Sequence, residues 1–175
     1  MNFRQLEIQG GQLYASSNKN SLTVASVGTG LPTDPGQSIT NLSGNPDSGN
    51  DPYGFALFNL KGGASWDTLY VADNTAGKIY KCSTSGAVGA KWSSEGSEKV
   101  ASVTGLTGTL VGSVPTLYAT ASGPLSNGTS VSFFQDNGDT EWYGDGLDSK
   151  DGLAQDFQKD LGVSLTYEQR YTQRQ

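Results

Sequence analysis

The residues best able to do chemistry in this sequence are carboxylates, and many lie close together. Eight of the 17 acidic residues fall within residues 136–160, where only two lysines accompany them. Carboxylate oxygens are ligands that Ca²⁺ prefers, and interspersed glycines allow a backbone to turn around an ion. We therefore expect a candidate calcium site in the 136–151 loop, with Asp136, Asp139, Asp145 and Asp148 as ligands. A solvated acidic loop is the alternative, because the spacing fits no EF-hand.

Paired carboxylates can also cleave a glycosidic bond, and Asp136, Glu141 and Asp145 are close enough in sequence to be considered. The general acid of such a pair needs a pKa raised by an apolar pocket, whereas a glycine-rich acidic loop favours exposure. The chain has no histidine, which excludes Ser-His-Asp and Cys-His nucleophile systems. We therefore expect no catalytic residue and keep a glycan-acting hydrolase as the alternative.

Aromatic side chains suggest a binding site of a different kind. Trp66, Trp142 and Tyr143, together with Trp92, lie at expected strand ends or in loops. Exposed rings at such places can stack on sugar faces while neighbouring polar groups bond the hydroxyls. We expect Trp66, Trp142 and Tyr143 to be ligand-binding residues, with packing between sheets as the alternative.

Composition and charge limit the possible partners and surroundings. The formal charge is −6, and the acidic residues outnumber the basic ones by 17 to 11, which disfavours binding to a phosphate backbone. No run of about 18 apolar residues is present, so no membrane-spanning helix is expected. The first residues lack the basic and apolar segments of a signal peptide. The single cysteine, Cys82, is expected to be a half-buried strand residue.

Short segments of alternating polarity indicate strands rather than helices up to about residue 135. Glycine, asparagine, aspartate and proline separate these segments at regular spacing, which favours an all-β sandwich, barrel or propeller. The expected strands include residues 6–8, 13–15, 22–24, 55–58, 69–72, 78–81 and 131–133.

An internal repeat favours the propeller among these architectures. Leu-Tyr pairs occur at 13–14, 69–70 and 117–118, with periods of 56 and 48 residues, and each pair begins an expected strand. Further apolar segments precede each pair, and residues 37–42 and 87–92 follow the first two. About four short strands in a repeat of this length are typical of a propeller blade. We expect three repeats in residues 1–135, at about 1–50, 51–99 and 100–135.

The stretch Leu69-Tyr70-Val71-Ala72-Asp73-Asn74-Thr75-Ala76-Gly77-Lys78-Ile79-Tyr80-Lys81 resembles the blade motif of NHL and YVTN-type β-propellers. Residues 3–135 as a whole resemble such repeats in bacterial exported proteins. The resemblance implies a tyrosine that spans the gap between adjacent sheets and an extracellular or cell-surface location. Asp136-Asn137-Gly138-Asp139-Thr140-Glu141-Trp142 is similar in part to the Asp-box of sialidase-type propellers, where the box is a folding turn remote from catalysis.

Residues 136–175 depart from the repeat. The acidic loop is followed by an expected helix over 150–161, with Leu153, Phe157 and Leu161 on one face and Gly162 at its end. Alternation over 163–167 predicts a last strand, and a polar tail follows.

Three blades fall short of the roughly four to eight that close a propeller. We expect the chain to be part of a larger propeller or to associate with itself, as a homodimer or with blades of a parent protein. The expected function is a non-catalytic secreted or surface module that binds a protein or glycan partner with the assistance of calcium. A self-assembling structural repeat is a further alternative.

Overall fold

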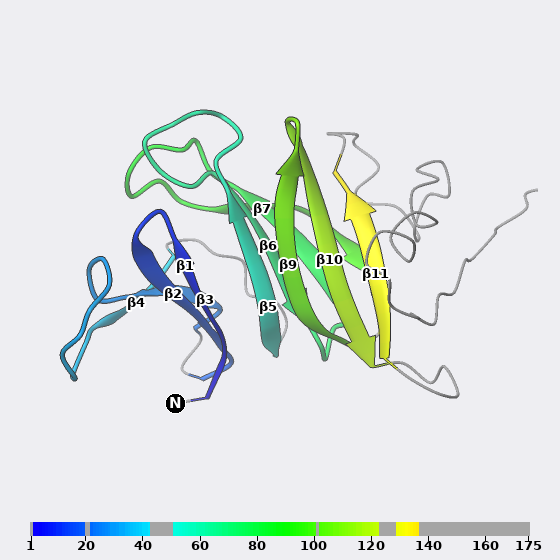
Figure 1. Ribbon diagram of the computed structural model, residues 1–175, viewed down its shortest axis with the longest axis horizontal. Helices are drawn as coiled ribbons and strands as arrows, with labels where there is room; N and C mark the ends of the chain where they lie inside the picture. Colours follow the sequence, from blue (N-terminus) through cyan, green and yellow to red (C-terminus); the bar gives the residue numbers. More distant parts are fainter. Residues whose placement is uncertain (1, 20–21, 43–50, 101, 123–128, 137–175) are drawn as a thin grey trace, which may run out of the picture.

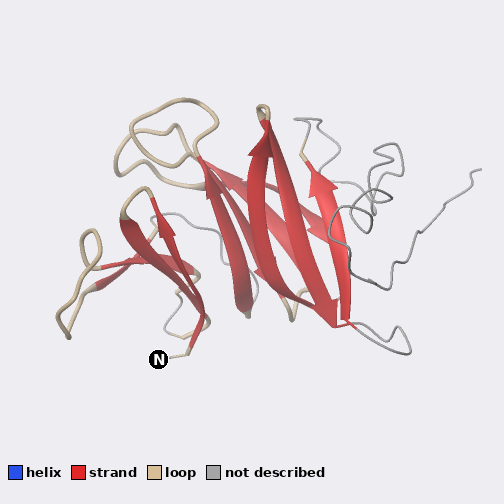
Figure 2. Cartoon of the chain, in the orientation of Figure 1, coloured by secondary structure: helices blue, strands red, loops and turns tan. Residues whose placement is uncertain are grey.

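The computed structural model describes residues 2–19, 22–42, 51–100, 102–122 and 129–136. Within these ranges the chain contains eleven strands and no helix, and every strand pairing is antiparallel. The strands form three sheets, called sheets A, B and C in chain order (Figures 1 and 2). The all-β prediction is confirmed. The expected helix over 150–161 lies outside the described residues.

Sheet A is a meander of four strands in sequence order: β1 (Phe3–Gln9), β2 (Gln12–Ser17), β3 (Val24–Val27) and β4 (Ile39–Asn41). Gly10 and Gly11 connect β1 to β2, with φ values of 56° and 75°. Positive φ at both central residues defines the two-residue hairpin turn that matches strand twist, and glycine adopts it without steric cost. The Gly-Gly pair therefore fixes the register in which Gln9 faces Gln12.

Sheet B has the same order of strands: β5 (Pro52–Phe58), β6 (Thr68–Asp73), β7 (Lys78–Ser83) and β8 (Ser93–Lys99). The expectation of a fourth strand at 87–92 is wrong, because that segment is a loop and the strand follows it. Gly86 and Gly89 both have positive φ, at 77° and 74°, which suits turns rather than a strand. β8 is an edge strand with mostly polar residues, so it lacks the apolar alternation that would have predicted it.

Sheet C contains three strands in the described part of the chain: β9 (Val103–Val111), β10 (Val114–Ser122) and β11 (Thr129–Gln135). The three sheets follow one another in chain order, with sheet A at one end and sheet C at the other (Figure 1). The described sheets do not close a ring, so the structure establishes antiparallel sheets but not a complete propeller.

Sheet B lies between the other two sheets and is buried on both faces. One face joins sheet C in a cluster that contains Phe58, Tyr70, Leu106 and Leu117. The opposite face joins sheet A in a second cluster that contains Tyr14, Phe55 and Leu69 among its members. Such double burial explains why all six residues of β6 are buried.

A glycine permits close approach of sheets B and C. A Cβ atom added at Gly54 in β5 would lie 2.2 Å from the backbone nitrogen of Leu106 in β9. That separation is far below van der Waals contact, so the two strands pack backbone against backbone here.

The Leu-Tyr pairs occupy equivalent places in the three sheets, each in the second strand. Successive strand residues point to opposite faces. Tyr14 and Tyr70 belong to the clusters shared with the following sheet, whereas Leu69 and Leu117 belong to the clusters shared with the preceding one. Sheets A and B therefore have a tyrosine face toward the next sheet, and sheets B and C have a leucine face toward the previous sheet.

Candidate functional site

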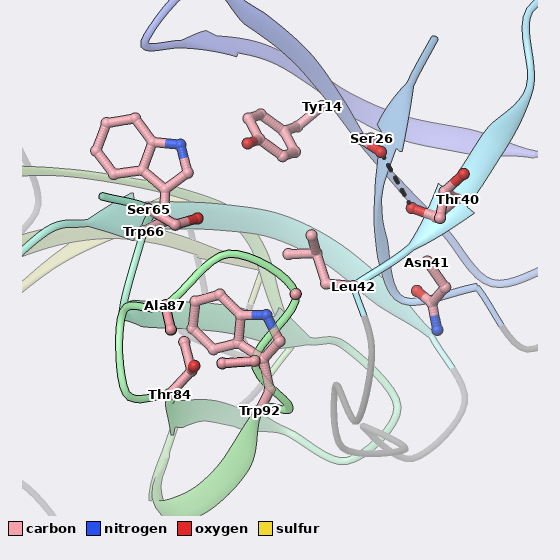
Figure 3. A pocket seen from close by; sticks show the side chains of 12 residues that line it. Tyr14, Ser26, Thr40, Asn41, Leu42, Ser65, Trp66, Thr84, Ala87 and Trp92 are labelled. Atoms are coloured by element: carbon pink, nitrogen blue, oxygen red, sulfur yellow. Dashed lines mark hydrogen bonds between the residues drawn. The ribbon is translucent and has the colours of Figure 1, made fainter. Parts of the chain in front are cut away.

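A pocket of about 230 Å³ lies between sheets A and B (Figure 3). Sheet A contributes its tyrosine face, and sheet B contributes the loops before β6 and after β7. The lining residues are Tyr14, Ser26, Thr40, Asn41, Leu42, Ser65, Trp66, Thr84, Ala87, Gly89, Ala90 and Trp92. None of them carries a formal charge. The volume is below the roughly 300–1,000 Å³ of pockets for drug-sized ligands, which suits a single ring or a chain end.

Three aromatic rings form the apolar part of the pocket. The Tyr14 hydroxyl points toward the indole of Trp66, and the Trp92 ring lies on the other side of the space (Figure 3). Burial raises the pKa of Tyr14, and a hydrogen bond with Trp66 partly opposes that shift. Trp92 is only 8% exposed, whereas Trp66 is half-buried and remains accessible.

The loop that carries Trp66 is held by the buried carboxylate of Asp67. Its two oxygens accept hydrogen bonds from the backbone N–H groups of Leu60 at 2.9 Å and Lys61 at 2.7 Å. Hydrogen bonds from backbone donors to a carboxylate are charge-assisted and short. Asp67 thereby fixes the turn between β5 and β6, and Trp66 is the residue before it.

The two loops from sheet B are also joined to each other. The Ser65 N–H donates to the carbonyl of Gly86 at 3.1 Å, and the Thr84 N–H donates to the carbonyl of Asp67 at 2.9 Å. The Lys61 ammonium donates to the Thr84 carbonyl at 2.6 Å. The pocket wall is therefore preorganised, which lowers the entropic cost of binding a ligand.

Polar groups supply hydrogen-bonding capacity at the pocket. Among the described residues, nothing bonds the Thr84 hydroxyl, although Thr84 is only 6% exposed. Ser26 donates to the Thr40 carbonyl at 3.4 Å, a weak bond that leaves the hydroxyl able to exchange partners. A buried polar group without a partner costs free energy that a bound ligand can recover.

The equivalent place between sheets B and C is filled by charged residues. There the Tyr70 hydroxyl donates to Asp136, and the Lys81 ammonium forms an ion pair with the same carboxylate. Burial raises the pKa of Tyr70, and the neighbouring Asp136 charge raises it further. The register places Ser26 opposite Tyr14 where Lys81 lies opposite Tyr70. The smaller side chain at this place leaves space between sheets A and B.

Thr84 in sheet B and Asp136 in sheet C occupy equivalent positions. The Thr84 N–H bonds the residue before β6, at Asp67, and the Asp136 N–H bonds Pro115 near the start of β10 at 3.0 Å. Each follows the third strand of its sheet. The tyrosine is therefore common to both places. The pocket exists between sheets A and B because Ser26 and Thr84 stand where the Lys81–Asp136 ion pair stands between sheets B and C.

Only some of the ligand-binding and calcium-binding residues predicted from the sequence lie in the part of the chain that the structure describes. Trp66 lines the pocket, whereas Trp142 and Tyr143 lie outside the described residues. Asp136 is buried and paired with Lys81, and the other calcium candidates, Asp139, Asp145 and Asp148, lie outside the described residues, as does Glu141. In the described part, no three His, Cys, Asp or Glu side chains gather where they could hold a metal ion.

Sequence reasoning did not predict Tyr14, Asn41 or Thr84 as pocket residues. Tyr14 had a signal, because it belongs to the Leu-Tyr repeat. Thr84 had none, since its place at the pocket depends on how the β7–β8 loop packs against sheet A. Cys82 lies in a strand as expected, but it is completely buried rather than half-buried. Burial together with the Glu95 charge raises its pKa to about 12, which makes it a poor nucleophile.

A scan against protein-family models and a search of curated proteins found no match to this sequence. Over the described ranges, no helix is long and apolar enough to cross a membrane.

Proposed function

We propose that this chain is a non-catalytic binding module of the β-propeller type, and that the pocket between sheets A and B takes a neutral glycan. The observation that carries the proposal is the lining: three aromatic rings beside hydroxyl and amide groups, with no charged side chain. Sugar rings present apolar C–H faces that stack on aromatic rings, and their hydroxyls need neutral donors and acceptors.

The geometry favours one sugar residue at the end of a glycan. The half-buried Trp66 provides the accessible stacking surface, and the hydroxyl of Thr84 provides a buried polar partner. The absence of charge from the lining argues for neutral rather than acidic sugars, because a buried carboxylate would need a cation or several donors.

We also propose a secreted or cell-surface location. This part of the proposal is supported by the sequence resemblance to NHL and YVTN-type propellers. We propose in addition that the chain binds calcium, with Asp139, Asp145 and Asp148 as ligands. Asp136 is less suited, because Lys81 already balances its charge. A melting temperature that rises with Ca²⁺, falls with a chelator and ignores Mg²⁺ would support the calcium site, and an unchanged value would remove it.

The test of glycan binding is an array of neutral and acidic glycans probed with the wild-type chain, followed by calorimetry on a neutral hit. Trp66→Ala is expected to weaken binding about tenfold or more, which corresponds to the ~1.4 kcal/mol contribution of a moderate aromatic contact. Trp66→Phe should retain part of the affinity, because a ring remains.

Phe3→Ala serves as the matched control. Phe3 is an aromatic residue of β1 that is 42% exposed and does not line the pocket. Its removal should leave glycan affinity unchanged. Binding to no glycan on the array, or equal loss of affinity in Trp66→Ala and Phe3→Ala, would contradict the proposal.

A further inference from the structure

The face of sheet A that points away from sheet B is apolar, and its large residues on β1 are exposed, whereas Ala15 on β2 is buried. Register pairs Leu6 with Ala15 and Ile8 with Leu13, so these four residues share the face opposite Tyr14. We call them the Leu6 face. Leu6 is 62% exposed and Ile8 is 60% exposed, which is unusual for neighbouring large apolar residues in a sheet.

Residues at the same positions in the other two sheets are buried. In sheet B, Phe55 pairs with Val71 and Leu57 pairs with Leu69, and Phe55 and Leu57 are 0% and 3% exposed. In sheet C, Leu106 pairs with Ala119 and is 4% exposed. In both cases the preceding sheet covers this face, so the Leu6 face is a sheet-packing face of the same construction.

The covering surface is in each case the tyrosine face of the preceding sheet. Tyr14 of sheet A packs over sheet B, and Tyr70 of sheet B packs over sheet C. The third tyrosine face belongs to sheet C, where Tyr118 pairs with Thr107 on β9. Thr107 is exposed. Sheets A and C are the two ends of the row of described sheets (Figure 1). A leucine face therefore lies at one end of this row and a tyrosine face at the other.

We propose that the tyrosine face of sheet C in one copy packs on the Leu6 face of a second copy. The contact is head-to-tail, because two unlike surfaces meet, and it repeats the packing already present between sheets A and B and between sheets B and C. The described residues of two copies supply six sheets, which lies within the roughly four to eight that close a ring. This inference is independent of glycan binding.

The experiment is size-exclusion chromatography with light scattering on the 175-residue chain. The wild type is expected at twice its 18.3 kDa mass. Leu6→Glu with Ile8→Glu should give the monomer, since two carboxylates would be buried in the contact. Val88→Glu is the matched control, because Val88 is an apolar loop residue, 82% exposed, that lies on neither face. It should remain a dimer.

A second variant tests the opposite face and does not depend on the first one folding. Thr107→Arg places a cation on the tyrosine face of sheet C and should also give the monomer. A wild-type monomer at every concentration would overturn the proposal, and would leave another segment, such as residues 137–175, to cover the faces. A dimer lost in the Leu6 face variant but kept in Thr107→Arg would show pairing of two Leu6 faces and would overturn head-to-tail packing.

Discussion

The hydroxyl of Tyr70 gives the clearest quantitative test of how sheets B and C are held together. Tyr70 is completely buried and donates to the Asp136 carboxylate, so Tyr70→Phe removes a hydrogen bond to a charged group. Such a bond contributes about 1.5–3 kcal/mol to stability. Tyr14→Phe is the matched change at the equivalent position of sheet A, where the partner is the neutral indole of Trp66. A bond between neutral groups contributes only about 0.5–1.5 kcal/mol.

Urea unfolding at pH 7 gives the free energies of both variants and the wild type, and thermal unfolding gives their melting temperatures. At about 2–4 °C per kcal/mol for a chain of this size, the Tyr70→Phe melting temperature should fall by roughly 3–12 °C. In an Asp136→Asn background the same change should cost less, because the acceptor is then neutral, and the difference is the coupling energy of the pair. Equal costs for Tyr70→Phe and Tyr14→Phe, or no coupling to residue 136, would refute the reasoning.

Three further changes probe the packing, the buried thiol and the pocket loop. Gly54→Ala should lower the free energy of unfolding by about 1–3 kcal/mol or more, because the new methyl would meet the backbone of Leu106; an unchanged urea midpoint would contradict the close approach. The folded-state pKa of Cys82 is raised from 9.0 to about 12, so its contribution to stability is complete below pH 9 and is lost as the pH rises toward 12. Cys82→Ala should therefore show a flatter fall of stability than the wild type above pH 9, and parallel curves would count against this assignment. Asp67→Asn should weaken glycan binding by releasing the turn before Trp66, and calorimetry that finds full affinity would show that the turn does not need the carboxylate.

The all-β fold was predictable because most strands carry apolar residues that face a neighbouring sheet. The segment 69–72 is a short apolar run bounded by turn residues, and it lies within β6. β8 was misplaced because its sequence is polar and it pairs only with β7. An edge strand of this kind is held by backbone hydrogen bonds, which leave no pattern in the side chains.

The candidate site was predictable only in part, because it depends on packing between distant segments. Trp66 stood out as an aromatic residue before a strand, which is a local signal. The burial of Asp136 could not be predicted, because the sequence places Asp136 at the start of an acidic segment and its partner Lys81 is 55 positions earlier. Thr84 lines the pocket as a result of the loop contacts with Asp67, and no local pattern distinguishes it from other threonines.

The most direct test of the glycan pocket is nuclear magnetic resonance of the three tryptophan indole N–H groups, assigned by single substitutions. During titration with a neutral oligosaccharide, the resonances of Trp66 and Trp92 should shift together and saturate, since both indoles line the pocket. Shifts confined to Trp142, or no saturable shift with any neutral glycan, would contradict a glycan site between sheets A and B.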